Sequence, residues 1–289
     1  MEKIPDSLID DLNKKKDIFA AKNNINKIIT ISIDEINKYA EKYSIAPVNI
    51  EIASLQLDIM PTRYERNYNT INFSEQIQLL LSTVAVIGCG GLGGNILEML
   101  ARLGIGNLIL VDGDIFNESN LNRQLLSTEN YIGKGKAEAA AARIKQINSS
   151  INTSTYSLFI DSTNSQKVIT GANIVIDALD NIPARFIVEA ASKDLKIPFI
   201  HGAINNMFGQ VSTIFPEDKG LKSIYGSPEK YNKRNIEDCP SVPSFTPAFV
   251  ASLQVAETLK IILNKGSLLR NKLLLANLET MDINILEME

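Results

Sequence analysis

The chain has 289 residues, of which 45% are hydrophobic and 21% charged, and its formal net charge is −4. This composition predicts an ordinary globular protein with a buried core, and the acidic balance argues against DNA binding, which needs a basic surface. No run approaches the ~18 consecutive apolar residues of a membrane span, and the acidic start lacks the apolar core of a signal peptide. We therefore expect a cytoplasmic protein with no membrane contact.

Thiol and imidazole groups are scarce. The sequence contains two cysteines, Cys89 and Cys239, and one histidine, His201. Two cysteines cannot form a disulfide framework, and a zinc site with four Cys or His ligands is not expected.

Residues 1–60 differ from the rest of the chain: they are rich in lysine and asparagine, lack glycine and have a helical pattern. Ser32 and Glu35 form a predicted capping box, with Ile31 and Ile36 as a hydrophobic staple, and Pro47 suits the first turn of a following helix. A helix-turn-helix DNA-binding region is disfavoured because acidic residues outnumber basic ones here. We predict a small helical extension that packs on the core or helps to recognise a partner.

From Val84 onward, aliphatic runs alternate with helical patterns, as in a doubly wound α/β protein. Strands are predicted at 84–88, 107–111, 153–158, 173–177 and 197–201, and helices at 93–103, 135–147, 164–170, 183–194 and 247–264. Later runs at 209–215, 272–278 and 281–287 predict an antiparallel extension. The predicted fold is α/β, with a Rossmann-like, mainly parallel sheet at residues 61–289.

Residues 84–112 have the features of a nucleotide-binding βαβ unit. Gly88, Gly90 and Gly93 follow a predicted strand and begin a helix, and Asp112 ends the next strand. Glycine permits the sharp turn and the close approach of the backbone to a phosphate, while the helix N-terminus attracts the anion and the acid can bind ribose. The polar segment 117–124 directly afterwards suits a nucleotide whose phosphates react.

With these features, the chain resembles the ThiF/MoeB/HesA family of adenylating enzymes, related to ubiquitin-activating enzymes. The similar segments run in family order over nearly four-fifths of the chain. They are RYERN at 63–67, GCGGLGG at 88–94, DGD at 112–114, SNLNRQ at 119–124, IGKGK at 132–136, ALDN at 178–181, HGA at 201–203 and FTPAFVASLQVAETLK at 245–260.

The resemblance implies ATP- and Mg²⁺-dependent adenylation of the C-terminal glycine of a small ubiquitin-like sulfur carrier that ends in Gly-Gly. It also implies a homodimer and a separate sulfur donor. The implied catalytic residues are Arg66, which would reach the partner subunit's site, with Arg123, Lys136 and the Mg²⁺ ligand Asp180. The implied ATP-binding residues are Gly88, Gly90, Gly91, Gly93, Asp112, Asp114, Ser119, Asn120, Arg123, Gln124, Lys136, Asp180 and Asn181.

Each candidate also has a purely structural interpretation. Lys136 could be a solvated surface lysine, and Asp180 could cap the helix at 183–194. His201 and Arg185 are expected to be structural, the first as a hydrogen-bonded core residue and the second in an ion pair. Cys89 is expected to pack beneath the glycine turn as a small apolar residue.

The polar, proline-rich segment 217–244 corresponds to the loop under which family members hold the carrier's tail. Cys239 lies at the position of a loop cysteine that some relatives use covalently and others do not need. Relatives with two CxxC pairs bind zinc, and this segment lacks those pairs.

Three other functions remain open. A tRNA-modifying member of the same family would need a cationic surface, which the acidic composition does not favour. A nicotinamide dehydrogenase would leave Arg123, Lys136 and Asp180 without a role, and a non-catalytic nucleotide-binding scaffold would not need them intact.

Overall fold

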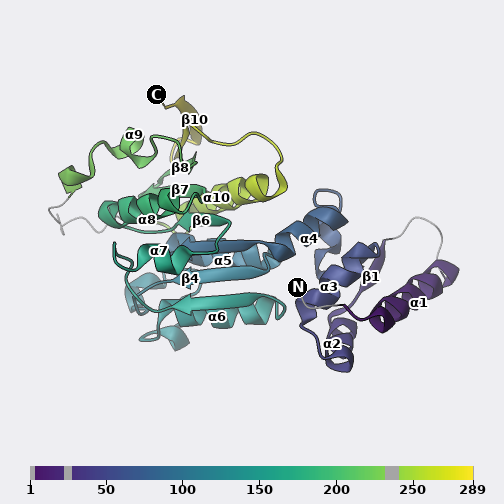
Figure 1. Ribbon diagram of the computed structural model, residues 1–289. Coiled ribbons are helices and arrows are strands. Elements are labelled where there is room, and N and C mark those ends of the chain that lie inside the picture. Colours follow the sequence, from purple (N-terminus) through teal and green to yellow (C-terminus); the bar gives the residue numbers. More distant parts are fainter. Residues whose placement is uncertain (1–3, 23–27, 232–240, 289) are drawn as a thin grey trace.

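The computed structural model describes residues 4–22, 28–231 and 241–288. An eight-stranded sheet with the order β10-β9-β8-β7-β6-β3-β4-β5 forms its centre (Figure 1). The strands are β3 (Thr83–Ile87), β4 (Asn107–Val111), β5 (Asn152–Tyr156), β6 (Ile174–Asp177), β7 (Phe199–Asn205), β8 (Phe208–Ile214), β9 (Lys272–Asn277) and β10 (Asp282–Glu287). Strands β7, β6, β3, β4 and β5 are parallel, while β8, β9 and β10 are antiparallel. The predicted fold class is confirmed.

Helices cover both faces of the parallel strands because alternate strand residues point to opposite sides. Val84 and Val86 face α5 (Gly91–Leu103), α6 (Lys136–Ile147) and α10 (Phe245–Leu263). Ala85 and Ile87 face α7 (Ser165–Ile169) and α8 (Ile182–Asp194). Strands buried on both faces are continuously aliphatic, which is why their positions were predictable.

Helix α10 is 19 residues long and mostly apolar, although polar residues interrupt the apolar run. By length and composition alone it is apolar enough to cross a membrane, and it is the single such helix in the described part of the chain. It packs against α5, β7 and β8, and its buried Gln254 donates a hydrogen bond to the carbonyl of Asp177 at 2.8 Å. Its apolar sequence is therefore explained by burial against the sheet.

The N-terminal region consists of α1 (Asp6–Lys22), β1 (Ile29–Ile31), α2 (Ile33–Tyr43), α3 (Pro47–Gln56) and β2 (Ile59–Pro61). The capping box of Ser32 and Glu35 is confirmed, as is Pro47 in the first turn of α3. Ile31 and Ile36 are buried in one cluster. The parallel pair β1–β2 was not predicted, because three-residue strands are too short to show an alternating pattern.

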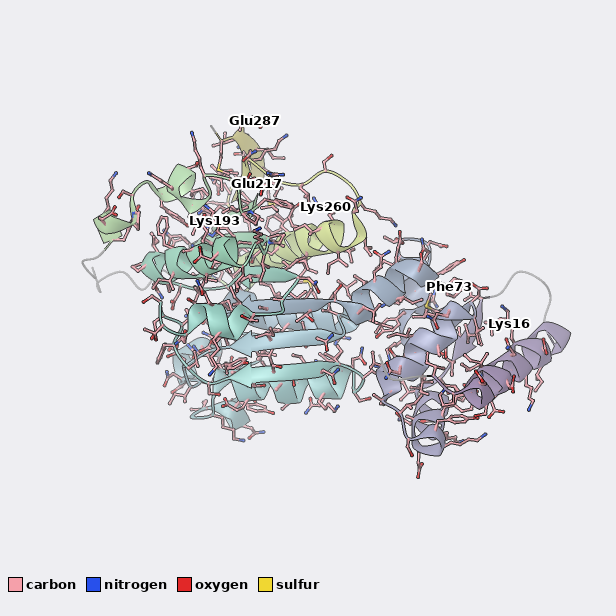
Figure 2. The ribbon with its side chains drawn as sticks, viewed as in Figure 1. Lys16, Phe73, Lys193, Glu217, Lys260 and Glu287 are labelled. Atoms are coloured by element: carbon pink, nitrogen blue, oxygen red, sulfur yellow. The ribbon has the colours of Figure 1, made fainter. Side chains whose placement is uncertain are left out.

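A buried polar cluster attaches this region to the sheet. Glu51 of α3 accepts a hydrogen bond from Ser150 at 2.8 Å, and Asn148 donates one to Tyr64 at 2.8 Å. Tyr64 belongs to η1 (Thr62–Asn67), which precedes α4 (Phe73–Leu81), and Phe73 lies where the two parts meet (Figure 2). Because 148–150 precede β5, this junction lies at the amino-terminal edge of the parallel strands.

Candidate active site

A pocket of about 440 Å³ lies at the opposite, carboxyl-terminal edge of the strands, where β3, β4 and β6 end. Its lining includes thirteen residues from the glycine loop and the start of α5, the loops after β4 and β6, α6 and α8. They are Gly88, Gly90, Gly91, Leu92, Asp112, Gly113, Asp114, Arg123, Gln124, Lys136, Asp180, Asn181 and Arg185. This is the edge at which doubly wound sheets bind their ligands.

The glycine loop is shaped by close backbone contacts. Gly88 has a φ of +101°, and a Cβ there would lie 2.5 Å from the carbonyl oxygen of Ala178. A Cβ at Gly93 would lie 1.8 Å from the carbonyl oxygen of Gly88, so Gly93 supports the turn without lining the pocket. Gly90 and Gly91 do line it, and a Cβ there would meet protein atoms no closer than 3.5 Å. The space beside these two glycines therefore remains open to a ligand.

Hydrogen bonds to Asp112 connect the glycine loop after β3 with the loop after β4. Its Oδ2 accepts a hydrogen bond from the backbone N–H of Cys89 at 2.7 Å, and its Oδ1 accepts one from Asp114 at 2.8 Å. Burial raises the pKa of this carboxyl group, while the two N–H donors oppose the shift. Asp112 is thus held rigidly beside the glycine loop, where its expected contact with ribose would be made.

Lys136 is the first residue of α6 and is only 7% exposed, so its interpretation as a solvated surface lysine is wrong. Its ammonium group lies 3.1 Å from Asp114 Oδ2, whose side chain is half exposed. The pocket thus contains a buried cation that a polyphosphate can approach.

Arg123 and Gln124 form another wall. Arg123 Nη1 donates hydrogen bonds to the carbonyl of Ser119 at 3.0 Å and to Asn122 at 2.9 Å. Gln124 is 7% exposed, and its Oε1 has no hydrogen-bond partner among the described residues. An unpaired buried acceptor costs free energy, so this oxygen favours a ligand that donates a hydrogen bond.

Besides Gly93, three implied residues lie outside the pocket lining. Ser119 contributes its carbonyl to Arg123, and Asn120 is 92% buried with its Oδ1 accepting from the backbone of Asn117 at 3.0 Å in η2 (Glu118–Asn120). Arg66 is an exposed residue of η1, at the amino-terminal edge of the sheet. Within one chain it is on the wrong side of the sheet to reach this pocket.

Asp180 follows β6 and is exposed, whereas the cap of α8 is Asn181, whose Oδ1 accepts from the backbone of Ala184 at 2.9 Å. The alternative role of Asp180 as that cap is therefore wrong. Among the described residues, no group of three or more His, Cys, Asp or Glu side chains is placed to hold a metal ion. An exposed carboxylate that lines a pocket of this kind still fits Mg²⁺, which usually takes one or two carboxylates with phosphate oxygens and waters.

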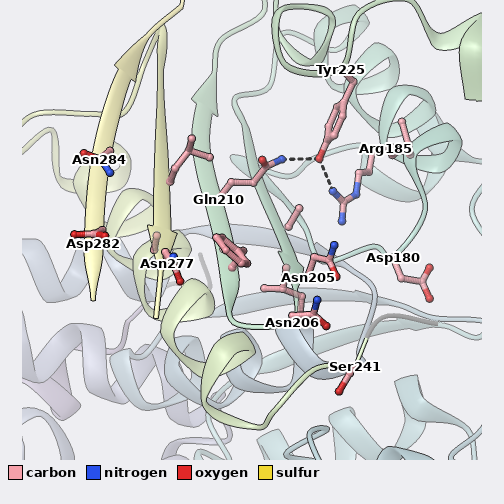
Figure 3. Close-up of a pocket in the computed structure, with 17 residues that line it drawn as sticks. Asp180, Arg185, Asn205, Asn206, Gln210, Tyr225, Ser241, Asn277, Asp282 and Asn284 are labelled. Atoms are coloured by element: carbon pink, nitrogen blue, oxygen red, sulfur yellow. Dashed lines mark hydrogen bonds between the residues drawn. The ribbon is translucent and has the colours of Figure 1, made fainter. Parts of the chain in front are cut away.

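A second pocket, of about 900 Å³, adjoins the first and shares Asp180, Arg185 and Ile204 with it. Figure 3 shows it lying over β7, β8, β9 and β10, with carboxamide side chains from several strands pointing into it. These are Asn205, Asn206, Gln210, Asn277 and Asn284. Sequence reasoning missed this pocket because its lining comes from strands that are neighbours in the sheet but far apart in the chain.

Sequence reasoning also missed Phe159, which lines the nucleotide pocket and is 69% exposed. It packs so closely on the loop after β4 that a Cβ at Gly113 would lie 2.7 Å from its backbone nitrogen. The apolar run Leu158–Ile160 directly after β5 was the available signal, since a strand end on this edge is a ligand position.

His201 is fully buried and hydrogen-bonded, as expected. Its Nδ1 lies 2.7 Å from Asp177 Oδ2, and its Nε2 lies 3.1 Å from the hydroxyl of Tyr225. Arg185 pairs with the same Asp177 oxygen at 3.6 Å, so its structural interpretation is confirmed as well. Burial lowers the pKa of His201, although the hydrogen bond to Asp177 opposes the shift.

This lowered pKa predicts a loss of stability in mild acid. Below the ordinary histidine pKa of about 6.5, the unfolded chain takes up a proton that the folded chain binds less readily. Each pH unit by which the pKa of the folded state lies below that of the unfolded state lowers the unfolding free energy in acid by ~1.4 kcal/mol. His201 is the sole histidine, so its titration is isolated. We expect the unfolding free energy of the wild type to fall between about pH 7 and 5, and that of His201→Gln to fall less. Equal slopes in urea titrations would contradict the expectation.

Of the two cysteines, Cys89 lies among the described residues and Cys239 does not. Cys89 is fully buried in the core and burial raises the pKa of its thiol, so the expected packing as a small apolar residue is confirmed. Cys239 lies outside the described residues, and its role stays a prediction.

Comparison with known proteins agrees with this geometry. The ThiF family model matches residues 64–289. A SAMP-activating enzyme E1 of Haloferax volcanii is 32% identical over 231 residues, which cover 78% of this chain and 83% of that protein. A molybdopterin-synthase adenylyltransferase of Haemophilus influenzae is 32% identical, covering 76% and 92%, and a sulfur carrier protein adenylyltransferase of Thermus thermophilus is 33% identical, covering 69% and 76%.

Solved structures extend the match. E. coli MccB with MccA-N7isoAsn superposes with a TM-score of 0.69 at 27% identity, covering 78% of this chain and 71% of that one. E. coli MccB with ATP has a TM-score of 0.70 at 24% identity, covering 98% and 87%. The second match includes the N-terminal region.

Proposed function

Because the chain belongs to the ThiF family of ATP-dependent adenylyltransferases, we propose that it activates the C-terminal carboxylate of a small sulfur-carrier protein. The observation that supports this assignment is the meeting of two pockets at Asp180 and Arg185. The first has the glycine loop, buried lysine and ribose-side acid of a nucleotide site. The second provides room for another substrate beside the phosphates.

In the proposed reaction, a carboxylate oxygen of the carrier attacks the α-phosphorus of ATP, the bond to the bridging oxygen breaks, and pyrophosphate leaves with the electron pair. The acyl adenylate remains bound. No general base is needed, because a carboxylate is already ionised at neutral pH. Arg123 and Lys136 would neutralise the two reacting anions and the charge that grows on pyrophosphate. Asp180 would hold Mg²⁺, which supplies further neutralisation of the phosphates.

The second pocket suits an extended peptide tail. Its carboxamides can each donate and accept hydrogen bonds, as an unpaired peptide backbone requires. Its acids Asp180 and Asp282 disfavour a highly acidic tail. An uncharged tail ending in Gly-Gly would enter most easily and bring its terminal carboxylate toward Arg185.

We also propose that the enzyme works as a homodimer in the cytoplasm, with Arg66 of each chain completing the other chain's site. Arg66 is exposed and makes no ion pair with any described residue, and it lies at the edge opposite its own pocket. A two-fold partner could present this guanidinium to the phosphates.

Mixed dimers test that arrangement. Arg66→Ala and Lys136→Ala should each be inactive alone, because each removes a cation from every site. Co-refolding equal amounts should restore about one quarter of wild-type activity, since half of random pairs are mixed and each mixed pair has one intact site. The control is a mixture of Arg123→Ala and Lys136→Ala, which lie in the same chain's pocket and should restore no activity, because every site of a mixed pair lacks one of the two side chains. A monomer in ultracentrifugation, or no restoration by the mixture of Arg66→Ala and Lys136→Ala, would refute the role of Arg66.

A second acceptor class is favoured by one observation. E. coli MccB has been crystallised with a form of MccA, and its ATP-bound structure superposes on 98% of this chain, including the N-terminal region, while the sequence relatives above match 69–78%. A peptide acceptor bound partly by residues 1–60 is therefore the alternative to a folded carrier. Both acceptors would present a carboxylate to the same site.

Pyrophosphate exchange tests the proposed function. With a purified ubiquitin-like carrier ending in Gly-Gly, labelled pyrophosphate should enter ATP, and it should not do so without the acceptor. Asp180→Ala and Arg123→Ala should abolish this exchange. Absence of exchange with both a carrier and a peptide acceptor would refute adenylation and favour a nucleotide-binding scaffold.

The same assay tests Cys239, for which we expect no part in adenylation. Attack by a carboxylate needs no thiol, so Cys239→Ala should keep wild-type exchange. Loss of exchange in a folded Cys239→Ala protein would assign the thiol a role in activation.

A further inference from the structure

A hydrogen-bonded group at the junction of the two pockets is centred on the hydroxyl of Tyr225, the last residue of α9 (Leu221–Tyr225). This oxygen lies 2.7 Å from Gln210 Nε2 and 2.9 Å from Arg185 Nη1 (Figure 3). It also lies 3.1 Å from His201 Nε2. Tyr225, Gln210 and Arg185 all line the second pocket, and Arg185 also lines the nucleotide pocket.

The direction of these bonds follows from the chemistry of the groups. A carboxylate only accepts, so His201 donates from Nδ1 to Asp177 and its Nε2 is left as an acceptor. Arg185 and Gln210 donate to the Tyr225 oxygen. His201 Nε2 can accept from the Tyr225 hydroxyl or from the carboxamide of Gln210, whose nitrogen lies 3.0 Å away.

The network continues to the turn that bears the proposed Mg²⁺ ligand. Asp177 Oδ1 accepts from the backbone N–H of Leu179 at 3.0 Å, and Arg185 Nη2 donates to the carbonyl of Leu179 at 2.5 Å. Both backbone groups of Leu179 are thus fixed by residues that Tyr225 touches directly or through His201. Asp180 is the next residue.

Tyr225 also anchors the segment after α9. Its carbonyl accepts a hydrogen bond from the hydroxyl of Tyr231 at 3.0 Å, and the two rings meet edge to face with centroids 6.3 Å apart. Tyr231 ends η4 (Pro228–Tyr231). Tyr225 thus lines the second pocket and is connected by hydrogen bonds to η4 and, through Arg185, to the turn that contains Leu179 and Asp180.

We propose that Tyr225 is a positioning residue that couples occupation of the second pocket to the placement of Asp180 in the nucleotide pocket. A tail that contacts Tyr225, Gln210 or Arg185 changes the bonds that hold Leu179, and the Asp180 carboxylate moves with that turn. Binding of tail and of Mg²⁺-nucleotide should then strengthen each other by the same factor, as linkage requires. The inference rests on the proposed function, since it needs both ligands.

Calorimetry with a non-hydrolysable ATP analogue and Mg²⁺, with and without a short synthetic peptide ending in Gly-Gly, tests the coupling. In the wild type the peptide should tighten analogue binding by roughly fivefold or more, the lower end of typical couplings. In Tyr225→Phe, which removes only the hydroxyl, the analogue alone should bind as in the wild type while the enhancement disappears. Tyr231→Phe is the matched control, because it removes a neighbouring hydroxyl that does not touch Arg185, and it should keep the enhancement.

Several results would overturn the proposal. One is a full enhancement in Tyr225→Phe, and another is an equal loss in Tyr231→Phe. A weaker affinity of Tyr225→Phe for the analogue alone, with a lower unfolding temperature, would assign the hydroxyl a merely structural role. If the wild type binds the analogue and exchanges pyrophosphate but shows no enhancement, the coupling fails and the proposed function stands; if it shows neither analogue binding nor exchange, the proposed function fails as well.

Discussion

Lys136→Ala should lower acceptor-dependent pyrophosphate exchange by about 10²–10³-fold, the usual cost of removing one fixed donor from a site of developing charge. The lysine is 7% exposed, so its charge acts in a medium with little water to screen it. Its described ionic partner, Asp114, has a half-exposed side chain. Removing the ammonium group therefore leaves no buried unpaired charge, and the unfolding temperature should change little.

The neighbouring Lys134 provides a matched control for this substitution. It is exposed, and its ammonium group lies 5.0 Å from the centre of the Tyr131 ring. Lys134→Ala removes the same charge two positions earlier and should leave exchange near the wild-type rate. Similar losses in both variants would mean that the overall positive charge of the loop matters. Wild-type exchange in Lys136→Ala would remove Lys136 from the site.

Predictions from sequence succeeded where the physical cause was local. Gly88 and Gly93 were identifiable because a strand that turns sharply into a helix needs glycine at both, and Asp112 because it ends the next strand. The aliphatic strands were visible as continuous apolar runs. In each case neighbouring residues along the chain contain the whole signal.

Predictions were missed or left ambiguous where residues distant in sequence decide the outcome. Tyr225 and Gln210 gave no signal, since their role depends on the antiparallel pairing of β7 with β8 and on the packing of α9. The sequence left open that Asp180 caps α8, and the geometry assigns the cap to Asn181 instead. The role of Arg66 is equally inaccessible from neighbouring residues in the sequence, because the site that it is proposed to complete belongs to another copy of the chain.

Gly91→Ala should separate nucleotide binding from folding. A Cβ at this first residue of α5 would lie 3.5 Å from its nearest neighbour, Pro247, which is an ordinary contact. Alanine also favours helix, so the unfolding temperature should stay near that of the wild type. If the phosphates lie directly against this backbone, as glycine in such loops permits, the methyl group should weaken ATP binding at least tenfold, or about 1.4 kcal/mol.

Gly93→Ala should lower both the stability of the fold and the affinity for ATP, in contrast to Gly91→Ala. Its Cβ would lie 1.8 Å from the carbonyl oxygen of Gly88, a backbone atom fixed by the hydrogen bond from Gly88 N–H to Val111 O at 2.8 Å. The loop must shift, so both the unfolding temperature and ATP affinity should fall. Thermal unfolding and calorimetric titration of ATP with Mg²⁺ measure the two quantities. Unchanged ATP affinity in Gly91→Ala would place the phosphates elsewhere, because a methyl group that folding tolerates can weaken binding only by occupying the ligand's own space.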